Sequence, residues 1–288
     1  MNKLLKNVMK LIPDKQYIKI KYFYHFKKFP NLKNPITYNE KLQWLKLYDR
    51  RPEYIKMVDK YEAKKIISDK VGTEYIIPSY GVWNSFDEID FDSLPNQFVL
   101  KTTHDCGGVY ICNNKAKFDK EKAKAFLEAH QKYNYFYEGR EWPYKEVKPR
   151  ILAEEYMENI STGDLKDYKV FAFDGSAKAL FVASDRQKDN EETKFDFYDM
   201  EFNHLDIKNG HPNSLNNFEK PNNLDDMKRI AEILSKGYPH IRVDFYDVNG
   251  KLYVGELTLY HFSGIVPFEP EKWDYTFGEW LTLPDKHF

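Results

Sequence analysis

The pattern of hydrophobic positions divides the chain into a helical N-terminal part and a strand-rich remainder. Thr37 precedes Glu40 by three residues, which is the spacing of a capping box at the start of a helix. Apolar residues at helical spacing predict helices over residues 37–48, 53–70, 119–133 and 223–237. Short runs rich in β-branched and aromatic residues predict strands over residues 76–83, 97–101, 109–113, 151–157, 168–175, 177–185, 241–248 and 251–260.

This order of elements predicts an α+β fold with mostly antiparallel strands and a helical N-terminal region over residues 1–74. A chain of 288 residues with 42% hydrophobic positions can bury one large core, or the cores of two to three subdomains that share a cleft. The sequence shows no internal repeat and no low-complexity linker.

The stretch 241–260 carries the most informative chemistry, because two β-rich runs with charged residues flank an Asn-Gly turn signal. A two-residue turn would place Asp244 and Glu256 on opposite faces of the hairpin. A three-residue loop, with Gly250 as a left-handed bulge residue, would set Arg242 opposite Glu256 and Asp244 diagonal to it on the same face. We predict this bulged register, since two carboxylates beside a guanidinium can hold Mg²⁺ against a polyphosphate. A surface hairpin with ordinary charges is the alternative.

Charge and cysteine content exclude some classes of protein. The 44 basic and 45 acidic side chains leave a net charge of -1, which gives no support to nucleic-acid binding. Two cysteines, Cys106 and Cys112, form no disulfide framework, so a reducing compartment and a cytoplasmic location are expected. No apolar run reaches the roughly 18–20 residues of a transmembrane helix.

The basic and aromatic N-terminus leaves two interpretations open. Residues 1–14 are predicted to form a packed first helix, with a small amphipathic helix on a membrane surface as the alternative. Residues 21–29 mix aromatic side chains with lysines. A half-buried helix with extended lysines is favoured there over a site for an acidic polymer or lipid headgroups.

Several common catalytic motifs are missing. The chain has no Walker A, GxGxxG, HExxH or GxSxG pattern and no zinc-site spacing. A strand ending at Lys101 does lead into a polar loop with Gly107 and Gly108, and paired glycines let backbone N–H groups approach a phosphate closely. Short glycine-containing hairpins are also common without a ligand. His104 and Asp105 in this loop would orient a substrate or simply satisfy the turn.

Two later strands carry unexpected charges. The run 151–157 holds Glu154 and Glu155, which would contact adenine and ribose, or would reflect ordinary alternation with one exposed glutamate. Lys169 interrupts an apolar and aromatic strand and would contact phosphate, unless it is an edge lysine that discourages aggregation. Arg186 ends the next strand and would lie at the mouth of the same cleft.

In this order, Lys101 with its glycine loop, the strand with two glutamates, Lys169 and the charged hairpin resemble the ATP-grasp enzymes. The resemblance is to the TupA-like branch, which is linked to bacterial surface-polysaccharide and teichuronopeptide biosynthesis. It spans residues 34–284, and the order and spacing of the segments make it specific. The segments are NPITYNEKLQWLKLYDR, LPNQFVLKTTHDCGG, GREWPYKEVKPRILAEEY, LKDYKVFAFDG, RVDFYDVNGKLYVGELT and WDYTFGEWLTLP.

The resemblance implies a core over residues 75–288 whose two α+β subdomains, near 97–175 and 176–288, clamp ATP. It implies that Lys101 and Lys169 contact the phosphates. The remaining implied nucleotide contacts come from Gly107, Gly108, Glu154, Glu155, Tyr156 and Met157.

The resemblance also implies a Mg²⁺ site at Asp244 and Glu256. Thr258 stands where many relatives carry an asparagine ligand, and a hydroxyl is a poorer ligand for this ion. Arg242 would hold the acyl phosphate. The other implied residues are Lys169 and His104 in catalysis, and Asp105, Arg186, His261 and Ser263 in substrate binding.

The implied reaction is ATP-dependent formation of an amide from a carboxylate and an amine. A uronic acid of a surface polysaccharide and an amino acid or amino sugar are the expected substrates, used in the cytoplasm or at the inner face of the bacterial membrane beside the polysaccharide machinery. The alternatives are a glycosyltransferase that uses the DxD pattern at 90–92, a kinase on the same fold and a non-catalytic binding module.

Overall fold

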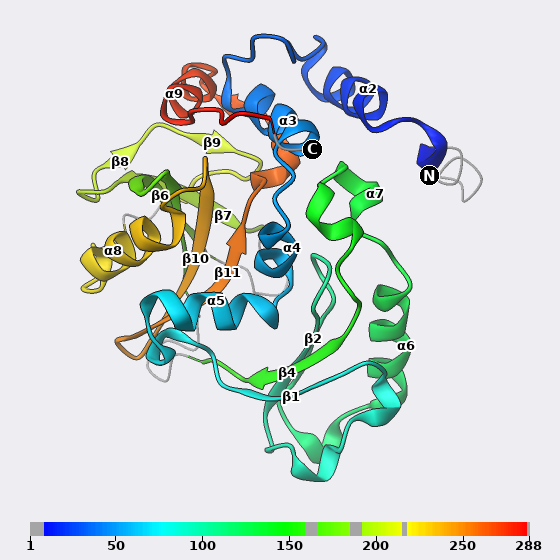
Figure 1. Ribbon diagram of the computed structural model, residues 1–288. Coiled ribbons are helices and arrows are strands. Elements are labelled where there is room, and N and C mark those ends of the chain that lie inside the picture. The colour runs from blue at the N-terminus through cyan, green and yellow to red at the C-terminus, as the bar shows by residue number, and fades with distance from the viewer. Residues whose placement is uncertain (1–8, 159–165, 185–191, 215–217, 287–288) are drawn as a thin grey trace.

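The computed structural model describes residues 9–158, 166–184, 192–214 and 218–286. Two main sheets, both antiparallel, organise the chain (Figure 1). The smaller sheet has the order β1-β4-β2-β3, formed by Ser79–Trp83, Ile151–Glu155, Phe98–Thr102 and Val109–Cys112. The larger sheet has the order β11-β10-β5-β6-β7-β8, formed by Lys251–Thr258, Ile241–Val248, Asp167–Phe173, Ser176–Ser184, Lys194–Asp199 and His204–Leu205. A two-stranded sheet pairs β9 (Lys208–Asn209) with β12 (Phe268–Glu269).

Helices complete the fold and confirm the predicted α+β class. The α-helices are α2 (Asp14–Phe26), α3 (Tyr38–Tyr48), α4 (Glu53–Val58), α5 (Glu62–Val71), α6 (Lys120–Gln131), α7 (Phe136–Gly139), α8 (Leu224–Ser235) and α9 (Lys272–Trp280). Short 3-10 helices are η1 (Thr73–Tyr75), η2 (Phe86–Glu88), η3 (Phe91–Ser93), η4 (Lys115–Lys117), η5 (Trp142–Lys145) and η6 (His261–Gly264).

Helix α8 covers one face of the larger sheet, where it contacts β5, β6 and β10 (Figure 1). Its apolar residues recur every three or four positions, and the side chains on that face are all buried. Met227 and Ile230 at its centre are fully buried, and each such side chain stabilises the fold by about 1.5–3 kcal/mol. Gly237 follows the helix with a positive φ, as predicted from its position.

The smaller sheet has a hydrophobic core of its own. Phe98, Leu100 and Ile151 from the sheet pack with Leu127 of α6 in a cluster separate from the main core. Strand β5 pairs with β10 and β6 in the larger sheet. The division between the two sheets therefore lies between β4 and β5, rather than at the subdomain boundary expected near residue 175.

The predicted helix over 53–70 is in fact two helices, α4 and α5. Asp59 interrupts it, because its side chain accepts hydrogen bonds from the backbone N–H groups of Tyr61 and Glu62 and its second oxygen pairs with Arg150 at 2.8 Å. The backbone N–H of Lys60 donates to Thr103 instead of continuing the helix. This break joins the helical region to the loop after β2.

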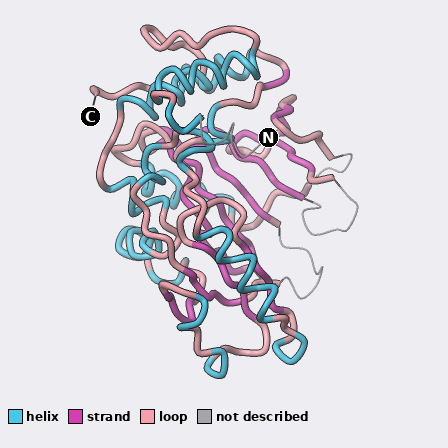
Figure 2. The backbone as a smooth tube through the Cα atoms, turned by 90° about the vertical axis from the view of Figure 1, so that its right-hand side faces the viewer, coloured by secondary structure: helices cyan, strands magenta, loops and turns pink. Residues whose placement is uncertain are grey.

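Helices α2, α3 and α9 lie together at one end of the molecule (Figure 1), and Figure 2 shows helices at this same end from the side. Thr37 caps α3 with the predicted capping box, in which the Glu40 side chain returns to the cap residue. Helix α3 contacts α9 and η6, and α2 contacts α3. As a result, α3 lies directly against the loop that follows β11.

Candidate active site

The turn of the β10–β11 hairpin differs from the prediction. Val248 pairs with Lys251, so the turn contains only Asn249 and Gly250, both with positive φ. This is the backbone geometry that an Asn-Gly pair favours, because its twist matches that of the flanking strands. The predicted three-residue loop is therefore wrong.

A bulge farther along the hairpin nevertheless places both acids on one face. The register shifts by one residue after Asp244, with Gly255 as the extra residue, so that Asp244 lies directly opposite Glu256. Cβ atoms of such a pair are typically about 4.5–5.5 Å apart. Arg242 lies opposite Thr258, not opposite Glu256 as predicted.

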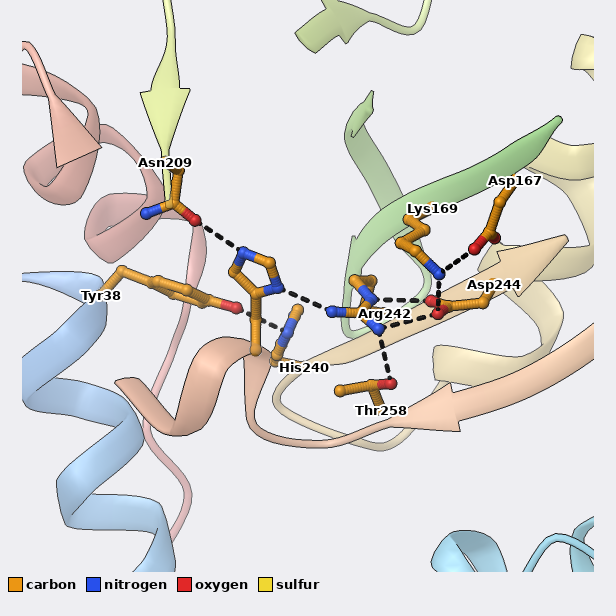
Figure 3. Close-up of polar contacts among 9 residues, drawn as sticks. Tyr38, Asp167, Lys169, Asn209, His240, Arg242, Asp244 and Thr258 are labelled. Atoms are coloured by element: carbon orange, nitrogen blue, oxygen red, sulfur yellow. Dashed lines mark hydrogen bonds and ion pairs between the residues drawn. The ribbon is translucent and has the colours of Figure 1, made fainter. Parts of the chain in front are cut away.

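Arg242 is the centre of a buried polar network (Figure 3). Its Nε and Nη2 atoms donate to the two carboxylate oxygens of Asp244, each at 2.7 Å, and Nη2 also donates to Thr258 Oγ1 at 3.0 Å. On the adjacent strand β5, the Lys169 ammonium pairs with Asp244 at 2.5 Å and with Asp167 at 2.7 Å. Lys169 is thus an interior lysine of the sheet with two acidic partners, not an edge lysine.

The charges of this network stabilise one another. Burial acts to raise the pKa of Asp244, but Arg242 and Lys169 outweigh it and hold that pKa below its usual value. The Asp244 carboxylate in turn outweighs the effect of burial on Arg242 and raises the pKa of the guanidinium. Asp244 is therefore ionised across the neutral pH range.

His261 fixes the other side of the guanidinium. The Asn209 amide nitrogen donates to the carbonyls of Val266 and Pro267, at 3.2 and 3.0 Å, so its oxygen faces His261 Nε2 at 2.8 Å. Nε2 must then carry the imidazole hydrogen, which leaves Nδ1 to accept from Arg242 Nη1 at 2.7 Å. Burial and the nearby Arg242 hold the pKa of His261 well below its usual value, which keeps the ring neutral.

Four of the five N–H bonds of Arg242 are engaged in this way, and within the described part of the chain nothing accepts the second hydrogen on Nη1. That hydrogen is left for a ligand. His261 orients Arg242, because both of its ring nitrogens are hydrogen-bonded. Its ring is not among the described residues that line the cavity described in the next paragraph. The expected contact between His261 and substrate is not what the geometry shows.

A cavity of about 560 Å³ lies over the network. Arg242 and Asp244 line it together with Glu256, which faces them from β11. The structure brings six of the predicted site residues to this cavity, namely Lys169, Arg242, Asp244, Glu256, Thr258 and Ser263. Residues that the sequence did not indicate line much of the rest, among them Cys106, Tyr135, Glu138, Glu141, Phe181, Phe195 and Phe262.

The loop η6 forms one wall of the cavity in a strained conformation. Phe262 and Ser263 have φ values of 46° and 55°, a left-handed geometry that costs roughly 1–3 kcal/mol for each non-glycine residue. Lys46 of α3 holds the loop, because its ammonium donates to the carbonyl and hydroxyl oxygens of Ser263 at 2.6 and 2.8 Å and to the carbonyl of Gly139 at 2.9 Å. Gln43 Nε2 adds a bond to the Ser263 carbonyl at 3.0 Å.

Lys46 and Glu141 are two buried titratable side chains that the sequence did not indicate, and each affects the pKa of the other. Burial lowers the pKa of Lys46 to about 7, against the opposing effect of Glu141. Burial raises the pKa of Glu141, although Lys46 and the Ser263 hydroxyl partly offset it. A signal for Lys46 did exist, since it continues the four-residue row of buried Tyr38 and Leu42 on α3.

A second charged cluster lies on the smaller sheet. Lys101 pairs with one oxygen of Glu154 at 2.5 Å, and Lys64 of α5 pairs with the other at 2.6 Å. Burial acts to raise the pKa of Glu154, but the two lysines outweigh it and hold that pKa below its usual value. Lys64 and Glu256 both line a small void of about 10 Å³ between α5 and β11. Nothing in the sequence distinguishes Lys64 from other lysines of its helix.

The loop after β2 is built as the glycines suggested, but its polar residues have structural partners. Gly107 has a φ of 110°, and a Cβ on Gly108 would lie 1.8 Å from Thr102 Oγ1. His104 Nε2 bonds to carbonyls at the end of α6 at 3.1 and 3.2 Å, and the Asp105 carboxylate contacts the Thr102 hydroxyl. Neither His104 nor Asp105 is among the described residues that line the cavity.

The remaining predicted contacts lie around the end of β4. Glu155 is half-buried at the last position of the strand, and Tyr156 and Met157 follow it, also half-buried. As far as the described residues show, the main cavity is not lined by these three. Arg186 lies outside the described residues.

The DxD pattern has a local role. The Asp90 side chain accepts from the backbone N–H of Asp92 at 3.1 Å and thereby caps η3. Both aspartates are exposed, and within the described chain neither lines the main cavity.

Asp244 and Glu256 fit one Mg²⁺ ion. Arg242 and Lys169 both donate to Asp244 Oδ2. Among the described residues, Oδ1 receives one hydrogen, from Arg242 Nε, and keeps a lone pair. Glu256 faces the cavity from the opposite strand. The described residues contain no group of three or more His, Cys, Asp and Glu side chains able to hold a metal. One or two carboxylates suffice for Mg²⁺, which usually takes its other ligands from water and substrate phosphates.

The family model for TupA-like ATP-grasp proteins matches residues 40–282. The chain belongs to the TupA-like ATP-grasp family. This match confirms the predicted family and covers both sheets, the cavity and α9. No curated relative matches the sequence.

Solved ATP-grasp structures show a weaker likeness. The D-alanine–D-alanine ligase from Bacillus anthracis complexed with ATP is 18% identical, with a TM-score of 0.42 over 70% of this chain and 54% of that one. The enzyme from Helicobacter pylori is 15% identical, with a TM-score of 0.44 over 85% and 69%. The ATP-grasp ligase PsnB with Mg and ADP is 11% identical, with a TM-score of 0.44 over 74% and 55%. The chain spans about half the length of the first of these structures. Among the described residues, no helix has the length and apolar character needed to span a membrane.

Proposed function

We propose that this TupA-like ATP-grasp protein is an ADP-forming ligase that uses ATP and Mg²⁺ to join a carboxylate to an amine through an acyl phosphate. The observation that carries the proposal is the convergence of Lys169, Arg242, Asp244 and Glu256 on one cavity. Phosphoryl transfer needs little beyond positioning and charge neutralisation, and these four residues can supply both. Membership of the family supports the assignment.

ATP would lie between the two sheets, which act as the two clamping subdomains. Lys101 and the Gly107–Gly108 backbone would contact the phosphates, and the segment 154–157 would contact adenine. Lys64 supports this placement, because it pairs with Glu154 of the smaller sheet and also lines a small void with Glu256 of the larger sheet.

In the first step, a carboxylate oxygen attacks the γ-phosphorus and ADP leaves with the electron pair of the broken P–O bond. Asp244 and Glu256 would hold Mg²⁺, which would supply neutralisation of charge on the phosphates. Lys169 stabilises the transferring group, and the second Nη1 hydrogen of Arg242 donates to an oxygen of the acyl phosphate. Because His261 and Thr258 fix the guanidinium, that hydrogen needs no reorientation during the reaction.

In the second step, the amine nitrogen attacks the acyl carbon and inorganic phosphate leaves. The nitrogen must lose a proton as the amide forms. Glu141 is the proposed acceptor, because it lines the cavity and burial raises its pKa. His104, which the resemblance assigned to catalysis, is not among the described residues that line the cavity.

A carbohydrate is the proposed carboxylate substrate, as a uronic acid of a bacterial surface polysaccharide, with an amino acid or amino sugar as the amine. The family association supports this class. Phe262 also lines the cavity and is only half-buried, so its ring suits the apolar face of a sugar. Contact with membrane-bound polysaccharide machinery is part of the same proposal.

The test is turnover of ATP with Mg²⁺, uronic acid glycosides and a panel of amines, followed by detection of ADP and amide. With hydroxylamine as the amine, an acyl phosphate gives a hydroxamate, whereas the phosphate ester made by a kinase does not. ADP formation that ignores the carboxylate would contradict a ligase. Metal-dependent sugar transfer that is lost in Asp90→Ala would favour the glycosyltransferase alternative.

Glu256→Gln is the sharpest variant, because it keeps the shape of the side chain and removes the charge that the metal needs. ATP turnover should fall by about 10²–10³-fold. Glu269→Gln, an exposed acid on β12, is the matched control and should leave turnover unchanged. Near-normal turnover in Glu256→Gln would remove the proposed metal role.

A further inference from the structure

Helix α2 exposes apolar side chains on the face that points away from the protein. Ile20, Phe23 and Tyr24 are 51%, 44% and 71% exposed, and they lie three and four positions apart on one face. Phe29, just after the helix, is 63% exposed, and its ring stacks on Phe23 at 4.8 Å. These four residues are termed the aromatic patch. Contiguous exposed apolar side chains of this kind mark interaction surfaces.

The opposite face of α2 packs against the rest of the protein. Tyr17, Ile18 and Tyr22 are buried, and the Tyr17 hydroxyl donates to the carbonyl of Glu138 at 3.0 Å. The aromatic patch is therefore additional to the packing face of the helix.

A groove rich in lysine lies beside the aromatic patch. Lys15 and Lys19 of α2, one turn apart, line it with Lys33 and Lys286, and Asn31 contributes an amide. Within the described chain, no acidic side chain pairs with Lys15, Lys19 or Lys33. These five residues are termed the lysine groove.

The surrounding segment has a strong charge bias. Residues 9–33 contain seven lysines and one acidic residue, Asp14, whereas the whole chain has a net charge of -1. Asp14 is already paired with Arg50 and Arg140 at 3.5 and 3.3 Å, so it does not neutralise the lysines. The segment thus presents a local positive field on a protein of nearly balanced charge.

We propose that α2 and residues 27–33 dock on an anionic membrane surface. The aromatic patch would enter the interface between headgroups and acyl chains, where aromatic rings and short apolar side chains are favoured. The lysine groove would take the phosphates of anionic lipid headgroups. A bilayer fits this surface better than a soluble polyanion does. A polyanion would pair with the lysine groove and leave the aromatic patch in water, whereas a bilayer would contact both. This proposal does not depend on the ligase chemistry.

The experiment is co-sedimentation of the full chain with vesicles at 0.15 M NaCl, a condition under which surface charges act over roughly 8 Å. Vesicles of equal phosphatidylglycerol and phosphatidylcholine should bind the protein, and pure phosphatidylcholine vesicles should not. The double variant Lys15→Gln/Lys19→Gln should weaken binding about 30-fold, at about fivefold for each lysine. Lys117→Gln/Lys178→Gln removes the same charge from exposed positions elsewhere and should have no effect.

The triple variant Phe23→Ser/Tyr24→Ser/Phe29→Ser tests the aromatic patch. It should weaken binding at least tenfold while circular dichroism and urea unfolding stay unchanged, because these rings are exposed. Equal binding to both vesicle types would overturn the proposal. Loss of binding in the lysine variant together with full binding in the serine variant, and displacement from vesicles by a soluble polyuronate, would overturn it in favour of an acidic polymer.

Discussion

Replacing Thr258 with valine removes one hydrogen-bond acceptor from Arg242 and keeps the shape of the side chain. The sequence suggested Thr258 as a weak Mg²⁺ ligand, whereas the structure engages its hydroxyl with Arg242 Nη2 at 3.0 Å. The two roles predict different kinetics, so the Thr258→Val variant distinguishes them.

The size of the effect follows from the contacts of the guanidinium. Arg242 would keep its two bonds to Asp244 and its bond to His261, but one buried N–H of a charged group would lose its partner. Hydrogen bonds to charged groups contribute roughly 1.5–3 kcal/mol. If the transition state loses that stabilisation, kcat should fall by about 10- to 100-fold, because each factor of ten in rate corresponds to about 1.4 kcal/mol.

The assay is ATP turnover measured against Mg²⁺ concentration for the wild type, Thr258→Val and the control Thr276→Val on α9. In the positioning role, kcat falls and the Mg²⁺ concentration at half-saturation stays within twofold. A tenfold rise in that concentration, with kcat restored at saturating Mg²⁺, would refute the reasoning and make Thr258 a metal ligand.

Three further predictions concern stability. Burial lowers the pKa of His240 to about 3, so the protein keeps its full stability above pH 6.5 and loses stability as the pH drops toward 3. At pH 5, His240 should lower the free energy of unfolding by about 2 kcal/mol, and His261 should act in the same direction. Urea unfolding of His240→Gln should therefore depend less on pH than that of the wild type. Gly255→Ala places a Cβ 2.6 Å from Tyr246 Cε2 and should destabilise the protein by about 1–3 kcal/mol in urea, and an unchanged midpoint would mean that the ring moves freely. Lys46→Met removes the Lys46 bonds to the Gly139 carbonyl and to both Ser263 oxygens and should cost about 3 kcal/mol together with a raised KM for the amine. Wild-type stability would show that the buried lysine is dispensable.

Much of the fold was predictable because local signals agreed with the packing. The capping box at Thr37 and the apolar face of α8 each indicate one structure and are found there. The prediction of one continuous helix over 53–70 was wrong, because the apolar spacing continues through Asp59. Only the tertiary partners of Asp59 and Lys60 show that the chain turns there.

The candidate site was predictable where charge interrupts an apolar strand, as at Lys169, Arg242 and Asp244. The register was not predicted, because a bulge at Gly255 compensates for the shorter turn; the glycine inside the strand run is the sequence signal for that bulge. Glu141 was missed because it sits in an irregular segment with no periodicity. Its burial depends on α3 and η6, which are distant in the sequence.

The hydrogen bonds of Lys46 to the strained η6 loop have a consequence for chimaeras made between related proteins. The pocket wall at Ser263 is shaped by a helix more than 200 residues earlier in the chain. Substrate preference should therefore be transferred between relatives only when α3 and η6 are exchanged together. A chimaera that exchanges one element without the other should fold with the η6 side of the cavity out of position.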